Sequence, residues 1–267
     1  MNKITARVFF IVLSSFAAFV MLYFGGKVLV CDRFVVKGES MEPEFHSGER
    51  VWVNKMKMGA RIYTDYDFSK PTLSAFRLPG FSKLKAGDVV VVNYPYARSK
   101  DTITFRINYV CLKRCYGAPG DTVRIKDGFY VNPSDGGNLG NLKHQRILSE
   151  TADSVLINKG VAINALRVND NLRWTIRDFG PMYVPRKGDT VSVDINNYRL
   201  WKRLIQFETG ISPIEKDGLV WLSGKPIGTY IFKNNWCFLG GDNVLNSEDS
   251  RYIGLFPEPY IVGVKWL

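Results

Sequence analysis

The run Asp88-Val89-Val90-Val91-Val92-Asn93-Tyr94 decides the fold class of this 267-residue chain. Its consecutive β-branched valines favour a strand, and Gly87 and Pro95 bound the run at its two ends. Two further short strands are expected at 34–36 and 50–53. Beyond its N-terminal segment, the chain is therefore predicted to be mainly β.

A second long strand is predicted over 107–116, and it ends at the Gly- and Pro-rich turn 117–121. The two-residue period of a strand places four side chains on one face: Tyr109, Cys111, Lys113 and Cys115. Aromatic and thiol surroundings disfavour an ammonium, and the free amine is the form that acts as a base. Lys113 is therefore a candidate base. The alternative is a surface lysine that snorkels from an edge strand.

The cysteines indicate neither a metal centre nor a disulfide scaffold. Four residues of strand separate the alpha carbons of Cys111 and Cys115 by about 13 Å, which is too far for a disulfide. With Cys31 and Cys237 they make four cysteines, without the paired CxxC spacing of a zinc site. We expect no metal and no cofactor.

The N-terminal segment is long and apolar. Residues 8–24 carry no charge, and the apolar character continues to Val30 with only Lys27 interrupting it. This exceeds the roughly 20 residues that a spanning helix needs. Residues 1–31 are therefore predicted to be a single-pass transmembrane anchor. A cleavable signal peptide is the alternative, which the length of the run disfavours, and the flanking positive charges do not decide the orientation.

A net charge of +11 calls for a negative partner. Nucleic acid is disfavoured because the basic residues are scattered and no helix-turn-helix, zinc-finger or RNP-like pattern occurs. An anionic membrane surface fits better beside a membrane segment. The basic and aromatic residues at 198–203 are interpreted as one face of a helix predicted over 197–208, which ends at Gly210.

Residues 128–232 are predicted to form an inserted α+β subdomain between two parts of a core, 32–127 and 233–267. Besides the helix, we expect in it a loop at 132–141, strands at 161–168 and 172–176, and a hairpin of 219–222 with 230–232. Residues 56–81 show little periodicity. They are expected to be either an exposed apolar rim or a loop packed on the core.

Two polar segments carry candidate chemistry. Ser40 follows the apolar N-terminal segment closely, with Gly38 two residues before it and Pro43 three after it. A serine held near a membrane is a candidate nucleophile, but the same pattern also describes a simple turn. The second segment, 238–252, is dense in Asp, Asn and Ser and lacks the spacing of a calcium loop.

Three motifs together resemble the ordered boxes of type I signal peptidases. They are Gly38-x-Ser40-Met41-x-Pro43, Lys113-Arg114-x-x-Gly117-x-Pro119-Gly120-Asp121 and Gly241-Asp242-Asn243-x-x-Asn246-Ser247-x-Asp249-Ser250-Arg251. The segment 87–91 resembles the strand box between the first two. The order, the spacing and the preceding apolar segment also match, over 8–127 and 233–267.

The resemblance implies a membrane-bound serine endopeptidase with an antiparallel β core of the signal-peptidase and repressor-peptidase type. Such an enzyme sits in the bacterial cytoplasmic membrane as a single-pass protein, with its catalytic domain on the exported side. Its partners are preprotein signal peptides and membrane lipids, not nucleic acid. It prefers small residues one and three positions before the cut.

The resemblance also assigns roles to residues of this chain. Ser40 would attack the scissile carbonyl, Lys113 would take its proton, and Ser247 would orient the Lys113 amine. His46 and His144 are the chain's histidines, so a serine-histidine-acid triad has few ways to form.

The remaining motif residues would support the loop as pairs, Arg114 with Asp242 and Asp249 with Arg251. Two departures from the family pattern stand out. Gly38 occupies a position where some members have a serine whose hydroxyl binds the oxyanion, so a main-chain donor such as the Ser40 amide would replace it. Val244 and Leu245 replace a charged pair that is usual in the last box.

Two other functions are compatible with these residues. A self-cleaving repressor-type peptidase shares the Ser-Lys dyad, but it would need a DNA-binding domain where this chain has an apolar segment. A membrane-tethered binding or assembly factor could keep the fold without turnover.

Overall fold

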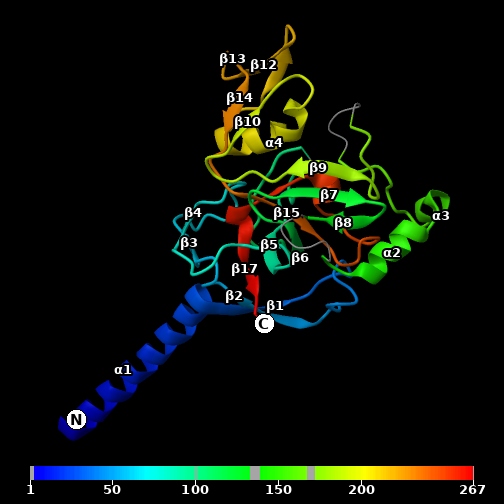
Figure 1. Ribbon diagram of the computed structural model, residues 1–267. Helices are drawn as coiled ribbons and strands as arrows, with labels where there is room; N and C mark the ends of the chain where they lie inside the picture. The colour runs from blue at the N-terminus through cyan, green and yellow to red at the C-terminus, as the bar shows by residue number, and fades with distance from the viewer. Residues whose placement is uncertain (1–2, 100, 133–138, 167–171, 267) are drawn as a thin grey trace.

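The computed structural model describes residues 3–99, 101–132, 139–166 and 172–266 (Figure 1). The α-helices are α1 (Lys3–Gly25), α2 (Leu142–Glu150), α3 (Asp153–Asn158), α4 (Tyr198–Thr209) and α5 (Ser250–Ile253), with a π-helical turn η1 (Gly26–Val30) and a 3-10 turn η3 (Glu258–Tyr260). The strands are β1 (Cys31–Val35), β2 (Arg50–Asn54), β3 (Arg61–Tyr63), β4 (Ala75–Arg77), β5 (Val89–Asn93), β6 (Val110–Gly117), β7 (Thr122–Lys126), β8 (Phe129–Val131), β9 (Phe179–Tyr183), β10 (Thr190–Ser192), β11 (Ile214–Lys216), β12 (Leu219–Leu222), β13 (Lys225–Ile227), β14 (Thr229–Ile231), β15 (Trp236–Gly240), β16 (Phe256–Pro257) and β17 (Ile261–Lys265).

The central sheet has seven strands in the order β1-β2-β17-β5-β6-β15-β16, and its neighbouring strands are antiparallel. The C-terminal strand β17 lies inside this sheet, between β2 and β5. Segments from both ends of the chain therefore form one sheet, as Figure 1 shows. The predicted mainly β, antiparallel core is confirmed.

Strand β5 explains why the valine run specifies the fold. All its residues are buried. Val90 and Val92 belong to the larger hydrophobic core, whereas Val89 and Val91 belong to a second cluster with Met41 of the Ser40 loop. Because alternate side chains of a strand point to opposite faces, a continuous valine run suits a strand that is covered on both sides.

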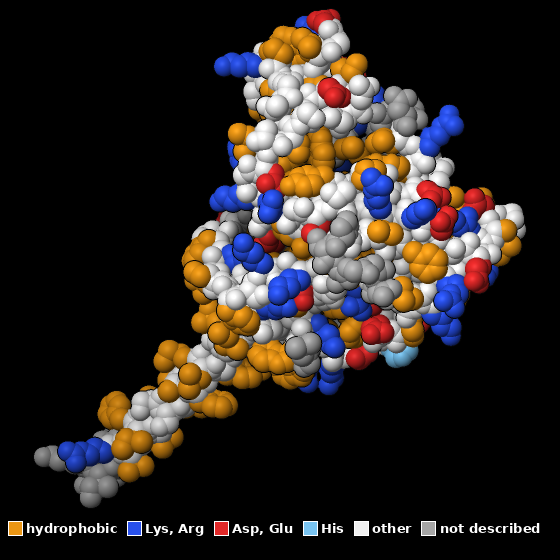
Figure 2. Space-filling model, in the orientation of Figure 1, with side chains coloured by type: hydrophobic (Ala, Val, Ile, Leu, Met, Phe, Trp, Pro, Cys, Tyr) orange, Lys and Arg blue, Asp and Glu red, His pale blue; other side chains and the backbone are white. Residues whose placement is uncertain are grey.

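The apolar N-terminal segment forms α1 and η1, and it projects away from the sheet (Figure 1). An 18-residue stretch within residues 7–30 has a mean hydropathy of 2.3 and none of it is buried, so the segment is long and apolar enough to cross a membrane. Figure 2 shows hydrophobic side chains around this helix. The predicted N-terminal apolar helix is confirmed.

The prediction for 56–81 missed a hairpin. Strands β3 and β4 pair there, and three-residue strands are too short to show a period in the sequence. Both expectations hold in part, since Met58 is buried whereas Phe76 is half exposed and Phe81 is largely exposed.

Two strand predictions in the middle of the chain are wrong. The strands expected at 161–168 and 172–176 reduce, within the described residues, to one bridge between Asn164 and Thr175. The expected hairpin of 219–222 with 230–232 does not form either. Instead β12 pairs with β13 through Ser223 and Gly224, which have positive φ angles of 54° and 77° and so form a two-residue turn, while β14 pairs with β10.

Helix α4 confirms the predicted amphipathic helix. Its buried residues include Trp201 and Ile205, and Gly210 ends it in the left-handed conformation with φ 75°. With β10 to β14 it forms the upper part of Figure 1. The short helices α2, α3 and α5 were not predicted. Of the loop expected at 132–141, residues 133–138 lie outside the described part of the chain.

Candidate active site

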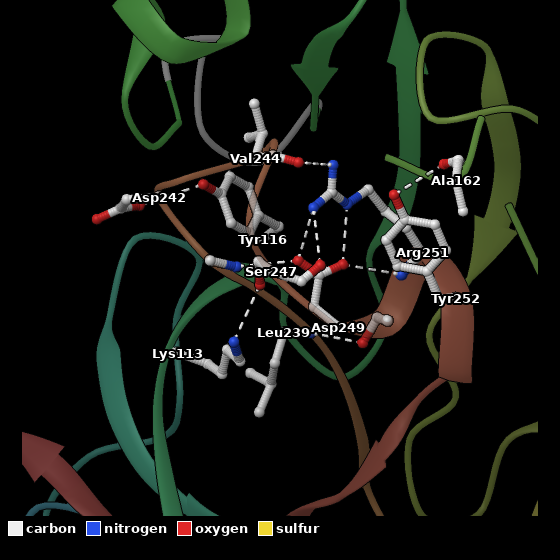
Figure 3. Close-up of polar contacts among 12 residues, drawn as sticks. Lys113, Tyr116, Ala162, Leu239, Asp242, Val244, Ser247, Asp249, Arg251 and Tyr252 are labelled. Atoms are coloured by element: carbon white, nitrogen blue, oxygen red, sulfur yellow. Dashed lines mark hydrogen bonds and ion pairs between the residues drawn. The ribbon is translucent and has the colours of Figure 1, made fainter. Parts of the chain in front are cut away.

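Strand β6 holds Lys113 inside the protein. Lys113 pairs with Val90 of β5, and its side chain is only 4% exposed, so it does not snorkel to the surface. Its Nζ atom lies 2.9 Å from the Oγ atom of Ser247, as Figure 3 shows. A buried amine thus has one fixed hydroxyl partner.

Strand β15 brings the loop of Ser247 to β6. Gly240, its last residue, pairs with Arg114, and the Asp242 carboxylate accepts two hydrogen bonds from that guanidinium, at 2.7 and 2.6 Å. The Tyr116 hydroxyl donates to the same carboxylate at 3.2 Å. Burial alone would lower the pKa of Arg114, but the hydrogen bonds and charge of Asp242 raise it. The fork-to-fork pair therefore fixes the start of the loop to the strand of Lys113.

Asp249 and Arg251 form a fully buried ion pair on the other side of Ser247. The Asp249 carboxylate accepts from the Arg251 Nε and Nη2 atoms, each at 2.8 Å, and it also caps α5 (Figure 3). Burial would raise the pKa of Asp249, but the charge and hydrogen bonds of Arg251, the charge of Lys113 and the hydrogen bond of Ser247 together lower it. The same pair raises the pKa of Arg251 well above its ordinary value, against the effect of burial.

The Ser40 loop reaches this site through its backbone. The Asn243 amide donates to the Ser40 carbonyl at 3.1 Å. A Cβ atom placed on Gly241 would lie 2.3 Å from that carbonyl oxygen and 2.4 Å from the Ser247 Oγ atom. Ser40 and Ser247 therefore approach one another over Gly241, at a place where only glycine fits without a shift.

Two asparagines add contacts that sequence reasoning missed. The Asn243 Nδ2 atom donates to the Glu39 carbonyl and the Asn246 Nδ2 atom donates to the Glu39 carboxylate, each at 3.1 Å. Together they hold the residue before Ser40. Both asparagines and Gly241 stand in the third motif, but the motif does not tell which side chains cross to the other loop.

The two departures from the family pattern have local explanations. Gly38 has a positive φ of 77° and open space around its alpha carbon, so its backbone angle, rather than crowding, favours glycine. Val244 is buried, and its carbonyl accepts from the Arg251 Nη1 atom at 2.8 Å. An apolar side chain suits that position.

Neither histidine and none of the four cysteines makes a hydrogen bond to Lys113 within the described part of the chain. The His46 side chain is largely exposed, with its Nδ1 atom 3.7 Å from Glu42, and His144 lies in the first turn of α2. All four cysteines are free, as predicted for Cys111 and Cys115. Within the described ranges, no group of three or more His, Cys, Asp or Glu side chains could hold a metal ion.

Comparison with known proteins places this site in a family. The profile described as "Signal peptidase, peptidase S26" matches residues 9–266. The chain belongs to the S26 signal peptidase family. The resemblance found in the three motifs is thereby confirmed at the level of the family.

Two curated relatives agree with this membership. Signal peptidase I of Buchnera aphidicola is 25% identical over 256 residues, which cover 94% of this chain and 73% of the relative. Signal peptidase I of Bacillus amyloliquefaciens is 27% identical over 236 residues, 88% of this chain and 71% of the relative. A crystal structure of a signal peptidase I from Enterococcus faecalis aligns with 68% of this chain and 97% of its own, at 18% identity and a TM-score of 0.28.

Proposed function

We propose that this member of the family is a membrane-anchored serine endopeptidase that removes signal peptides from exported preproteins with a Ser40-Lys113 dyad. The observation that carries the proposal is the buried Lys113 amine, held by Ser247 in a loop that also contacts the Ser40 backbone. The family membership supports the same reaction class.

In the first chemical step, the Ser40 hydroxyl attacks the scissile carbonyl and the free amine of Lys113 takes the hydroxyl proton. A tetrahedral oxyanion forms. The Ser40 amide donates to no acceptor within the described part of the chain, so it is free to bind that oxyanion. This main-chain donor takes the place of the hydroxyl that Gly38 lacks.

In the following steps, the carbon–nitrogen bond breaks and the Lys113 ammonium gives its proton to the leaving amine. The product is an ester between Ser40 and the signal peptide. Water then attacks this ester with Lys113 again as the base, which frees the cleaved peptide and restores the Ser40 hydroxyl. Ser247 keeps the amine in one orientation throughout, because its Oγ atom is a fixed partner at 2.9 Å.

Arg114 with Asp242, and Asp249 with Arg251, would act as supports that hold the two ends of the Ser247 loop. We also propose that 8–30 spans the bacterial cytoplasmic membrane, with the rest of the chain on the exported side, and that small residues are preferred one and three positions before the cut. The length and apolar character of the helix support the anchoring.

The experiment is the incubation of the full-length protein, in an uncharged detergent, with a purified preprotein. Mass spectrometry of the products should show one cut after the signal peptide. The Ser40→Ala variant, which removes only the attacking oxygen, should give no product. Preprotein that stays intact with the wild-type protein, yet binds to it, would favour the binding or assembly factor instead.

A further inference from the structure

A cavity on the flank of the protein gathers positive charge. It has a volume of about 230 Å³ and lies between the β3–β4 hairpin and the segments around Asn235 and Pro259. Four of its lining residues are basic, namely Arg61, Arg77, Lys187 and Lys233, and one, Glu258, is acidic. Figure 2 shows lysine and arginine side chains on the flank beside the hairpin.

The four basic residues lack acidic partners. In the part of the chain that the structure describes, none of them forms an ion pair with a carboxylate. The two lysine residues are exposed, and among the described residues their ammonium groups make no hydrogen bond, while the main-chain amide of Lys187 donates to Asn235 and that of Lys233 to Glu208. Both ammonium groups are therefore available to a ligand.

The two arginines are buried or nearly so and are held by neutral oxygens. Arg61 donates to the Pro259 carbonyl at 3.2 Å and to the Asn93 side chain at 3.0 Å. Arg77 donates to the Gly59 and Ile261 carbonyls, at 2.7 and 2.6 Å. These contacts fix the guanidinium groups without an ion pair, and the charge of Glu258 offsets that of Arg77 only in part, which is costly inside a protein.

The like charges also act on each other. Burial and, after it, the charge of Arg61 lower the pKa of Arg77, the charge of Glu258 acts against them, and the resulting pKa is about 10. An anion in the cavity would offset both the burial and the repulsion. The lining keeps a net positive charge even with Glu258 ionised, so the field in the cavity favours an anion.

We propose that this cavity binds a phosphate group. The two lysines at the rim supply ammonium donors for the phosphate oxygens. The two guanidinium groups, whose terminal N–H groups mostly donate to protein oxygens, add fixed positive charge to the lining. The cavity is large enough for one such group with its first waters.

The phosphate group has two potential sources, a free phosphate ester or ion and the headgroup of an anionic lipid. The hairpin that carries both arginines contacts η1, where the apolar N-terminal segment ends. Phe76 of the same hairpin lines the cavity and is half exposed. A lipid headgroup would therefore meet the cavity close to the apolar helix.

The test uses the full-length protein in an uncharged detergent and measures its Tm at constant ionic strength. Inorganic phosphate replaces chloride in one series. Dioctanoyl phosphatidylglycerol is compared in a second series with dioctanoylglycerol, which lacks the phosphate. A ligand that binds only the folded state raises the Tm with its concentration. We expect a saturable rise in at least one series.

Variants decide whether the rise comes from this cavity. The double variant Lys187→Gln with Lys233→Gln should raise the apparent Kd for inorganic phosphate or for the phospholipid, whichever raises the Tm, about tenfold. Glu258→Gln, which removes the acidic side chain, should lower the Kd, an effect that a merely structural site would not give. The matched control is Lys216→Gln with Lys225→Gln, on β11 and β13, which should leave the Kd unchanged.

A rise with phosphate identifies a free phosphate as a ligand, and a rise with the phospholipid alone identifies the headgroup as the source. The proposal is overturned if neither series differs from its control compound. It is also overturned if the Lys187 and Lys233 replacements leave the Kd of the active series unchanged.

Discussion

The Nζ atom of Lys113 and the Oγ atom of Ser247 lie 2.9 Å apart, although 134 residues separate them in the chain. Strand β6 supplies the lysine, and the loop that follows β15 supplies the serine. Arg114 and Asp242 join the two segments directly beside this contact. The hydrogen bond to Ser247 and the support beside it therefore hold the Lys113 amine in a fixed position.

Replacing Ser247 with alanine should lower kcat about 100-fold, because the amine loses the partner that orients it. KM and Tm should change little, since the hydroxyl is small and the loop keeps its other supports. Steady-state kinetics on a signal-peptide substrate, with thermal unfolding, measures all three. Ser192→Ala, on the exposed strand β10, is the control. A Ser247→Ala enzyme with the wild-type kcat would show that the contact has no role in catalysis.

The Gly241→Ala variant should also lose most of its activity. The added Cβ atom would lie 2.3 Å from the Ser40 carbonyl and 2.4 Å from the Ser247 Oγ atom, so the two loops must separate. A displacement of about 1 Å can cost about 100-fold in rate. Gly228→Ala is a matched control, because its Cβ atom meets nothing within 4 Å. Equal kcat/KM values for the two variants would exclude this role of Gly241.

The sequence was enough to name the candidate site residues, but it did not show how they are held together. The motifs supplied Ser40, Lys113 and Ser247 through a family resemblance, but no local pattern shows that Gly241 separates two loops. Such a contact joins distant parts of the chain and depends on how β15 is paired.

For the fold as well, elements with strong local patterns were predicted correctly, whereas some strand pairings were not. The valine run of β5 and the helical spacing of α4 are strong local signals, and both elements formed where they were predicted. Strand β12 was paired with the wrong partner because the short Ser223-Gly224 turn was not recognised. The β3–β4 hairpin was missed because its strands are too short to show a period.

Replacing Asp249 with asparagine should destabilise the protein by about 3–5 kcal/mol, because it leaves the buried Arg251 without a counter-charge. The double variant Asp249→Asn with Arg251→Met should be less destabilised than the sum of the single variants. Urea unfolding of the wild type, the two single variants and the double variant gives the four free energies of unfolding. Additive losses would mean that the two side chains are not coupled.

Because of the same ion pair, the free energy of unfolding should fall at acid pH. The folded state lowers the pKa of Asp249, so at low pH the unfolded chain binds the proton more tightly. The stabilisation is present above about pH 4, the ordinary range of an aspartate, and is lost as the pH falls through the folded value. Urea unfolding between about pH 5 and pH 2 should show a shallower decline for the double variant than for the wild type. Parallel declines would exclude Asp249 as a source of this fall.

The proposed orientation predicts which part of the chain an added protease can reach from outside the cell. With residues 8–30 in the membrane and the catalytic part outside, protease added to intact spheroplasts should digest the bulk of the chain, leaving a short N-terminal fragment. A cytoplasmic marker protein should stay intact in the same sample. Protection of the catalytic part would reverse the orientation and remove the basis for a role in export.

The most direct measurement is the rate of preprotein cleavage by the Ser40→Ala, Lys113→Met and double variants. Groups that act as one unit lose nearly the whole effect when either is removed, so the double variant should be no slower than either single variant. Each single variant should retain the wild-type Tm and show no cleavage above background. A Lys113→Met variant that cleaves at the wild-type rate, or a double variant much slower than both singles, would contradict the Ser40-Lys113 dyad.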